Sequence, residues 1–186
     1  MVHFAAVFSP GFCSAKSANT GAIVVNADDI HGQNRYSVFL HWLSENPQKS
    51  AVVAAKVNNR ERLKSLGVLT ANPITYPKTD SKINSKADPK NTSHFLLQKM
   101  IEKPKIFVSD LANTGMYYFT KNDLKRIPKN RQKTGVDEEF LTTDFVLPLT
   151  QFSEVFVVKT FAPWLIISTP DDVVFASQEV VKSNFR

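Results

Sequence analysis

The sequence has a single cysteine, Cys13, among its 186 residues. An intrachain disulfide is therefore excluded, and the lone thiol favours a reducing compartment. No apolar run is long enough to cross a bilayer, since the longest, residues 155–167, is interrupted by Lys159 and Pro163. The first eight residues are apolar but have no basic lead, which predicts a strand and not a signal peptide. These absences predict an intracellular, cytoplasmic protein.

Glycine is also scarce, and none of the six glycines stands in a phosphate-binding loop followed by Lys-Ser or Lys-Thr. Nucleotide hydrolysis of that kind is not expected. No local signature pairs Cys13 with a histidine as nucleophile and base. Asp28, Asp29 and His31 lie close together, but acidic surface turns are common and nothing identifies a further metal ligand. We predict no catalytic residue, no metal and no cofactor.

Charge is present but unevenly distributed along the chain, whose net charge is +6. Residues 1–70 carry a net charge of +3, residues 71–133 of +8 and residues 134–186 of −5. Eight of the fourteen phenylalanines lie in the last 68 residues, so the core is expected to draw mainly on the C-terminal third. A basic middle segment beside an acidic, apolar end suggests a surface for a polyanion attached to a packing unit.

Hydrophobic periodicity predicts an α+β fold, namely a mostly antiparallel sheet with three or four helices and a long exposed basic loop. The whole chain is expected to form a single domain, with residues 71–92 as a long loop or insertion. Expected strands cover residues 2–8, 21–25, 51–57, 105–110, 116–120, 140–149, 154–160 and 164–168. Expected helices begin at Arg35, after a cap at Asn58 or Asn59, at Ser93, at Asn122 and at Pro170.

The most basic segment, residues 121–133, directly follows two tyrosines on a predicted strand. Cations that neutralise phosphates, beside aromatic rings that stack on bases, are typical of single-strand nucleic-acid binding. Tyr117 and Tyr118 point to opposite faces of a strand, so at least one belongs to the core. A solvated basic turn is the other interpretation. The predicted nucleic-acid-binding residues are Lys121, Lys125, Arg126, Lys129, Arg131, Lys133, Tyr117 and Tyr118.

The lysines at 78, 82, 86 and 90 recur every four residues in a polar segment flanked by prolines. As a flexible basic arm they would assist the segment at 121–133, although a plain solvated loop is the favoured interpretation.

The sequence thus predicts a non-enzymatic nucleic-acid-binding subunit that contacts RNA or DNA phosphates without reading bases. The alternative is a structural or assembly subunit of a virion or other multiprotein particle, in which the basic middle docks on the acidic end of a neighbouring copy. A small hydrolase or nuclease is the second alternative. The predicted partners are nucleic acid or an acidic protein surface, with self-assembly as a further option and no membrane.

Overall fold

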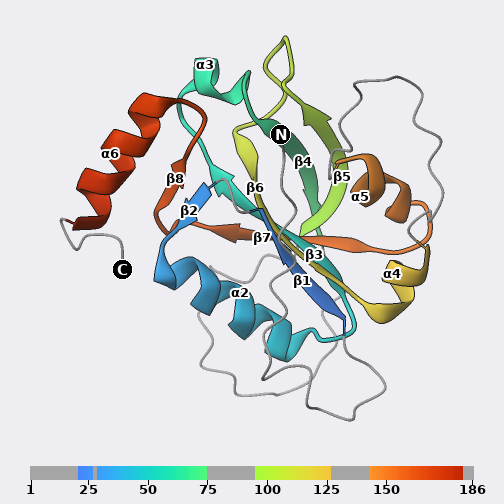
Figure 1. Ribbon diagram of the computed structural model, residues 1–186. Coiled ribbons are helices and arrows are strands. Elements are labelled where there is room, and N and C mark those ends of the chain that lie inside the picture. The colour runs from blue at the N-terminus through green and yellow to red at the C-terminus, as the bar shows by residue number, and fades with distance from the viewer. Residues whose placement is uncertain (1–20, 27–28, 75–94, 127–142, 182–186) are drawn as a thin grey trace, which may run out of the picture.

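A central sheet of six strands organises the chain (Figure 1). The computed structural model describes residues 21–26, 29–74, 95–126 and 143–181. The strands follow the order β1-β6-β3-β7-β5-β4 across the sheet. Their bounds are β1 Ala22–Val25, β3 Ser50–Lys56, β4 Gly67–Pro73, β5 Phe95–Glu102, β6 Leu111–Phe119 and β7 Val155–Thr160.

The centre of the sheet is a parallel pair, β3 and β7, in register from Ser50 opposite Val155 to Ala55 opposite Thr160. Every residue of β3 except Lys56 is buried. Continuous burial of this kind is what a strand in a parallel pair requires, since both faces are covered. The other strand pairs are antiparallel, so the sheet is mixed. The expected α+β fold with a mostly antiparallel sheet is therefore the wrong class.

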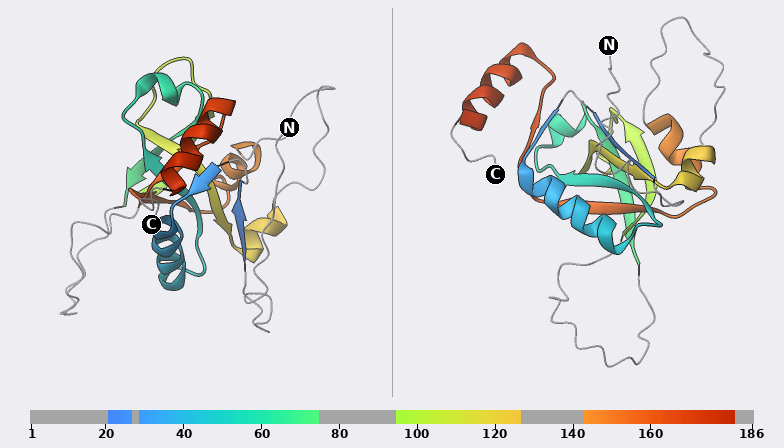
Figure 2. Two further views of the ribbon diagram at one scale, coloured as in Figure 1. Left: turned by 60° about the vertical axis from the view of Figure 1, so that its left-hand side comes forward. Right: turned by 60° about the horizontal axis from the view of Figure 1, so that its bottom comes forward.

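Helices cover both faces of this sheet (Figure 2). Phe39 and Leu43 of α2 (Gln33–Glu45) pack on one face, against Val53 and neighbouring side chains. Val146 and Leu149 of α5 (Thr143–Leu149) pack on the other face, in one cluster with Tyr117 and Phe119 of β6. The remaining helices are short or peripheral, and their bounds are α3 Arg60–Leu63, α4 Lys121–Arg126 and α6 Pro170–Val181.

A β-bulge explains why β5 was expected to be a helix. Leu97 and Met100 are both buried in the core cluster on the α5 face, although three positions separate them. The register with β4 shifts at this point, because Thr70 lies opposite Lys99 whereas Ala71 lies opposite Leu97. The extra residue of a bulge brings both side chains to the same face. The resulting apolar spacing imitates a helical period, and the prediction of a helix from Ser93 is wrong.

A second bulge lies in β6, where a hairpin turn was expected around residues 113–115. The register with β3 shifts between Val52 and Ala54, and Gly115 has a φ of 71°. Glycine adopts this left-handed conformation readily. The strand therefore continues through the turn-like residues, and residues 105–110 form no strand.

Several local predictions are confirmed. The helix from Arg35 ends before Asn46-Pro47 as α2, and the side chain of Asn59 caps α3 by accepting hydrogen bonds from two backbone N–H groups. The strand expected over residues 140–149 is wrong, because α5 occupies Thr143–Leu149. Of the predicted loop at 71–92, Ala71 to Pro73 belong to β4, and the part beyond residue 74 lies outside the described residues, as does the expected strand at 2–8.

A separate two-stranded ribbon, β2 (Asp29–His31) with β8 (Trp164–Ile166), lies beside the sheet and leads into α6. Helix α6 projects from the body at the left of Figure 1. None of the helices in the described ranges has the length and apolarity that a membrane crossing demands. The prediction of a single domain over residues 1–186 stays a prediction.

Candidate functional site

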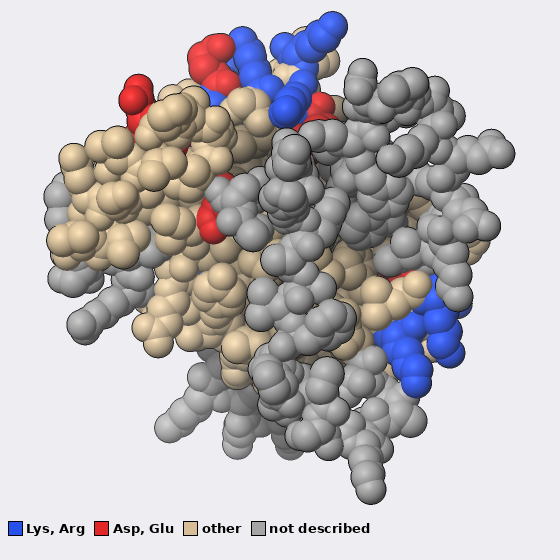
Figure 3. All heavy atoms as spheres, in the orientation of Figure 1, with Lys and Arg blue, Asp and Glu red and all other residues tan. Residues whose placement is uncertain are grey.

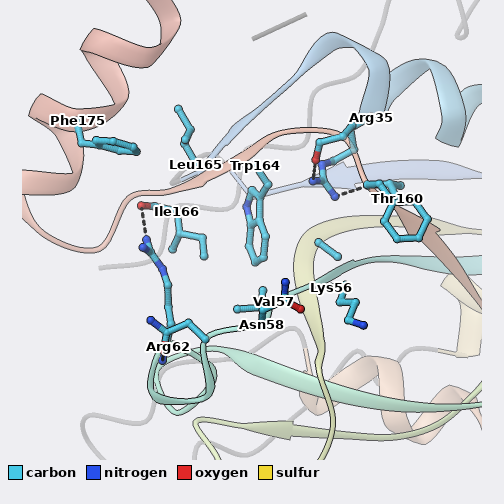
Figure 4. Close-up of a pocket in the computed structure, with 14 residues that line it drawn as sticks. Arg35, Lys56, Val57, Asn58, Arg62, Thr160, Trp164, Leu165, Ile166 and Phe175 are labelled. Atoms are coloured by element: carbon cyan, nitrogen blue, oxygen red, sulfur yellow. Dashed lines mark hydrogen bonds between the residues drawn. The ribbon is translucent and has the colours of Figure 1, made fainter. Parts of the chain in front are cut away.

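A cavity of about 370 Å³ opens where the parallel strands β3 and β7 end (Figure 4). Ligands of α/β proteins commonly bind beyond the carboxyl ends of parallel strands. The lining contains three cationic side chains and no carboxylate, which gives the cavity a basic character. We call it the Arg35 cavity, and its lining residues are Arg35, Ala55, Lys56, Val57, Asn58, Asn59, Arg62, Thr160, Phe161, Ala162, Trp164, Leu165, Ile166 and Phe175.

Arg35 is almost completely buried although it is cationic. Its guanidinium donates hydrogen bonds to the Thr160 hydroxyl and to the Ala162 carbonyl oxygen, which connects α2 to the end of β7. Burial lowers the pKa of Arg35 to about 10, and the nearby charge of Asp29 opposes this effect. Only its Nε lacks a partner in the described part of the chain. Arg35 thus remains charged at neutral pH and holds the wall of the cavity.

The β2–β8 ribbon is fixed by the carboxylate of Asp29. One oxygen accepts a hydrogen bond of 2.9 Å from Trp164 Nε1, and the other accepts one of 3.1 Å from the backbone N–H of Ile167. His31, on the same strand, is buried and packs edge-on to Tyr36 at 5.9 Å between ring centroids. Burial, and secondarily the charge of Arg35, lowers the pKa of His31 to about 4.

The other two cations of the cavity already have acidic partners. Lys56 Nζ lies 3.3 Å from Asp110, and Arg62 lies 3.6 Å from Asp172 while donating a hydrogen bond to the Ile166 carbonyl. The Arg35 cavity therefore consists mainly of groups that hold the ribbon and α6 in place, and a ligand would have to displace some of them.

A second constellation lies at the same end of the sheet, where β4 begins and β5 ends. Gly67 pairs with Glu102 in the β4–β5 register. A Cβ atom on Gly67 would lie 2.9 Å from Glu102 Oε2 and 3.5 Å from Asn113 Cβ, so both side chains extend over the bare backbone of the glycine. We call this constellation the Glu102 corner, and its residues are Gly67, Glu102, Lys103 and Asn113.

The backbone of Lys103 has a φ of 44°, the only positive value among the described residues other than glycine. Its N–H donates a hydrogen bond of 3.0 Å to the Leu66 carbonyl, and its side chain is exposed before the buried Pro104. A left-handed conformation is unfavourable for lysine, and such residues cluster at functional sites. The turn thus presents an exposed cation directly after Glu102 in the chain.

Asn113 faces the α5 side of the sheet, because its amide donates a hydrogen bond to the buried Tyr117 hydroxyl. Its neighbour Ala112 packs with Trp164 and Ile166 on the opposite side. The Glu102 corner and the Arg35 cavity therefore lie on opposite faces of one sheet end. A carboxylate, an amide and a lysine around a glycine can hydrogen-bond hydroxyl groups and pair with one anionic group.

Of the predicted nucleic-acid-binding residues, the five that the structure describes do not form one open surface. Tyr117 and Tyr118 are buried on β6, so neither ring is accessible for stacking. Lys121 and Lys125 are exposed on α4, and the α4 cations form a small blue area at the lower right of Figure 3. Arg126 donates hydrogen bonds to Phe152 and Ser153. Lys129, Arg131 and Lys133 lie outside the described residues.

Sequence analysis missed the Glu102 corner entirely. Its residues come from β4, β5, β6 and the turn after β5, a region where a helix from Ser93 was expected. The sequence does contain a glycine at the start of one strand and a Glu-Lys-Pro stretch at the end of the next. These residues indicate a common site only once the β4–β5 register, which places Gly67 opposite Glu102, is known.

Comparison with known proteins identifies similar sequences and folds. The sequence model of the nucleotidyl transferase family matches residues 7–183. No curated protein matches the chain significantly in sequence. A UDP-glucose pyrophosphorylase solved in complex with UDP-glucose superimposes with a TM-score of 0.66 at 19% identity, over 90% of this chain and 58% of that chain.

Two further solved structures share the fold. The UTP-bound UDP-glucose pyrophosphorylase of Acinetobacter baumannii has a TM-score of 0.60 at 13% identity, over 86% of this chain and 50% of that one. A glucose-1-phosphate thymidylyltransferase of Bacillus anthracis, in complex with a sucrose, has a TM-score of 0.61 at 16% identity, over 91% and 58%. The fold is thus the Rossmann-like one of these enzymes, and the chain spans little more than half of their length.

Proposed function

Because the chain belongs to the nucleotidyl transferase family, we propose that it takes part in nucleotidyl transfer to a sugar phosphate. In that reaction a phosphate oxygen of the sugar phosphate attacks the α-phosphorus of a nucleoside triphosphate. A new P–O bond forms, and the bond to the departing pyrophosphate breaks. The ligand classes follow from the similar structures, namely UDP-glucose pyrophosphorylase and glucose-1-phosphate thymidylyltransferase.

This membership corrects the function expected from the sequence. A non-enzymatic nucleic-acid-binding subunit is the wrong function, and a viral structural subunit is wrong as well. The basic character of residues 71–133 misled the prediction, because charge was counted along the chain without knowing which cations share a surface.

The Glu102 corner is the place that suits the sugar phosphate. The carboxylate of Glu102 accepts hydrogen bonds from sugar hydroxyls, and the exposed ammonium of Lys103 pairs with the phosphate. Gly67 leaves room for the Glu102 carboxylate over its backbone, since an added Cβ atom would lie 2.9 Å from Glu102 Oε2. The Arg35 cavity suits this role less well, because its lining includes no carboxylate that could accept hydrogen bonds from sugar hydroxyls.

Divalent cations usually accompany the phosphates in this reaction class. The described residues do not form a site for one. No group of three His, Cys, Asp or Glu side chains converges within the described ranges, and both carboxylate oxygens of Asp29 accept hydrogen bonds. The role that we assign to the residues of the Glu102 corner is to bind the sugar phosphate.

The family match over residues 7–183 is the observation that carries the proposal. Isothermal titration of the purified chain with glucose 1-phosphate and with UDP-glucose tests it. Glu102→Gln removes the negative charge at constant size and should weaken binding by about tenfold, as expected for a lost charge-assisted hydrogen bond. Glu61→Gln, an exposed carboxylate on α3 that pairs with Lys64, is the matched control and should bind normally.

Two outcomes would contradict the proposal. One is failure of the folded chain to bind either ligand, and the other is unchanged affinity in Glu102→Gln. The second outcome, combined with a loss of binding in Arg62→Gln, would move the ligand from the Glu102 corner to the Arg35 cavity.

A further inference from the structure

Helix α6 exposes an apolar stripe that nothing in the described chain covers. Val173, Val174, Val180 and Val181 recur at i, i+1, i+7 and i+8, which places them on one side of the helix. Their exposed fractions range from 44% for Val180 to 83% for Val181, whereas Ala176 is the helix's only buried residue. The face over α6 is mostly uncharged at the left of Figure 3. We call these four valines the α6 stripe.

The helix is well formed despite this exposure. The carboxylate of Asp172 accepts hydrogen bonds from the backbone N–H groups of Ser168 and Thr169 and from the Thr169 hydroxyl. These bonds, the one from Ser168 first, lower the pKa of Asp172. A capped helix start of this kind stabilises α6 independently of packing. A stable helix with four exposed valines is typical of an interface.

The second exposed apolar surface lies beside α3. Ile106 is 77% exposed and Phe107 is 51% exposed. Next to them is a cavity of about 150 Å³, lined in part by Leu63, Val68 and Pro104. A cavity of this size holds a group as large as a benzene ring, which exceeds a valine side chain. We call Ile106, Phe107 and this cavity the 106–107 surface.

The two surfaces are complementary in charge. Within Pro170–Val181 the helix carries Asp171, Asp172 and Glu179 and no lysine or arginine. The cavity is lined by Arg60, whose guanidinium lies 4.6 Å from the Phe107 ring centroid, and by the Lys64–Glu61 ion pair, whose charges cancel. With the exposed Lys105 beside Ile106, the charge of the 106–107 surface is positive overall. An acidic, apolar helix therefore matches a basic, apolar recess on the same chain, which favours another copy of this chain as the occupant.

The position of α3 permits two copies of the chain to make a closed, symmetric contact through the α6 stripe and the 106–107 surface. Arg62 of α3 contacts Asp172 on the α6 side, whereas Arg60 and Leu63 line the cavity on the other side. Helix α3 thus lies between the two surfaces. A two-fold axis close to α3 lets each α6 reach the 106–107 surface of its partner, so that the same contact forms twice.

We propose that two copies of the chain form a symmetric dimer in which the α6 stripe of each copy covers the 106–107 surface of the other. The doubled contact allows an interface of the usual size, about 800 Å² per subunit. The proposal stands apart from nucleotidyl transfer, because neither surface includes the Glu102 corner.

Sedimentation velocity and light scattering of the full chain test the dimer. The expected species is twice the 20.9 kDa of the chain. Val174→Glu combined with Val181→Glu should weaken association at least tenfold and leave a folded monomer, since both side chains are already exposed in the single chain. Val38→Glu is the matched control, because it changes a similarly exposed valine on α2, which belongs to neither surface, and should leave the dimer intact.

Disulfide cross-linking tests which surfaces meet. In a Cys13→Ser background, a chain with Val174→Cys mixed with a chain with Ile106→Cys should form linked pairs under mild oxidation, and neither should do so alone. A monomer at all concentrations would overturn the proposal. Linkage of Val174→Cys to itself would also overturn it, because α6 would then pack on α6.

Discussion

At the scale of single residues, Gly67 shows how a missing side chain shapes the Glu102 corner. Its backbone does not adopt a positive φ, so the chain geometry alone would accept alanine. The constraint comes from Glu102, whose carboxylate oxygen would lie 2.9 Å from an added Cβ. Since this atom is the far end of a flexible side chain, the carboxylate can move away while the strands stay in place.

We therefore expect Gly67→Ala to separate function from stability. The free energy of unfolding should change by less than about 1 kcal/mol, because β4 tolerates alanine and the clash is relieved by a rotamer change. Binding of glucose 1-phosphate should weaken by about tenfold, since the displaced carboxylate no longer meets the sugar. Urea denaturation and calorimetric titration of the same samples measure the two effects. Equal losses in both would show that Gly67 is structural only.

The burial of His31 makes the stability of the fold depend on pH, and its lowered pKa determines the direction of the effect. The pKa is about 4 in the folded chain and 6.5 in the reference state. As the pH falls from 6.5 towards 4, the unfolded chain takes up a proton that the folded chain does not bind, so stability decreases through this window and then levels off. Above pH 6.5 the group has no effect.

His31→Gln removes this titration and keeps a polar side chain of similar size. The difference in unfolding free energy between pH 7 and pH 4.5, measured with urea, should be smaller in the variant than in the unmodified chain. Carboxylates titrate in both proteins and cancel in the comparison. An identical pH dependence would show that His31 is solvated in the folded state.

At the scale of elements, a buried carboxylate attaches α4 to the sheet. The buried carboxylate of Asp123 accepts hydrogen bonds from the hydroxyls of Ser50, Thr120 and Ser153. These groups belong to β3, to the end of β6 and to the turn before β7. Arg126 extends the same network to Phe152 and Ser153. Charge within residues 121–133 thus serves the attachment of α4 as well as solvation.

Asp123→Ala should lower the free energy of unfolding by about 2–4 kcal/mol, because it leaves three hydroxyls without an acceptor in a buried place. Lys125→Ala on the exposed side of the same helix should change it by less than about 0.5 kcal/mol. Chemical denaturation of the two variants measures the contrast. A neutral Asp123→Ala would mean that water satisfies these hydroxyls.

The sequence predicted correctly those features of the fold that depend only on neighbouring residues. The stop of α2 at Asn46-Pro47 and the cap of α3 at Asn59 each depend on neighbouring residues. β5 and β6 were misassigned because a bulge in each shifts the apolar spacing, and a bulge is specified by the partner strand. The Glu102 corner escaped for the same reason, since three strands must pair before its residues meet.

At the scale of the whole molecule, the cations that the structure describes within residues 95–126 do not lie on one face. Lys121, Lys125 and Arg126 belong to α4, whereas Lys103 follows β5 and bonds through its N–H to Leu66, close to α3, and the two helices lie apart in Figure 1. The acidic end contributes α6, whose exposed valines and carboxylates carry our proposed dimer. The net charge of +6 therefore says little about function until the chain is folded.

The parallel pair β3–β7 at the centre of the sheet also affects when the chain can fold. Ser50 pairs with Val155, more than a hundred residues further along. Closing so long a loop costs conformational entropy before the contacts that compensate for it have formed. Folding is therefore slower for chains with many such long-range contacts. During synthesis β3 has to wait for β7 to leave the ribosome, with its apolar residues meanwhile unpaired on that side. The nascent polypeptide is consequently a candidate client for chaperones.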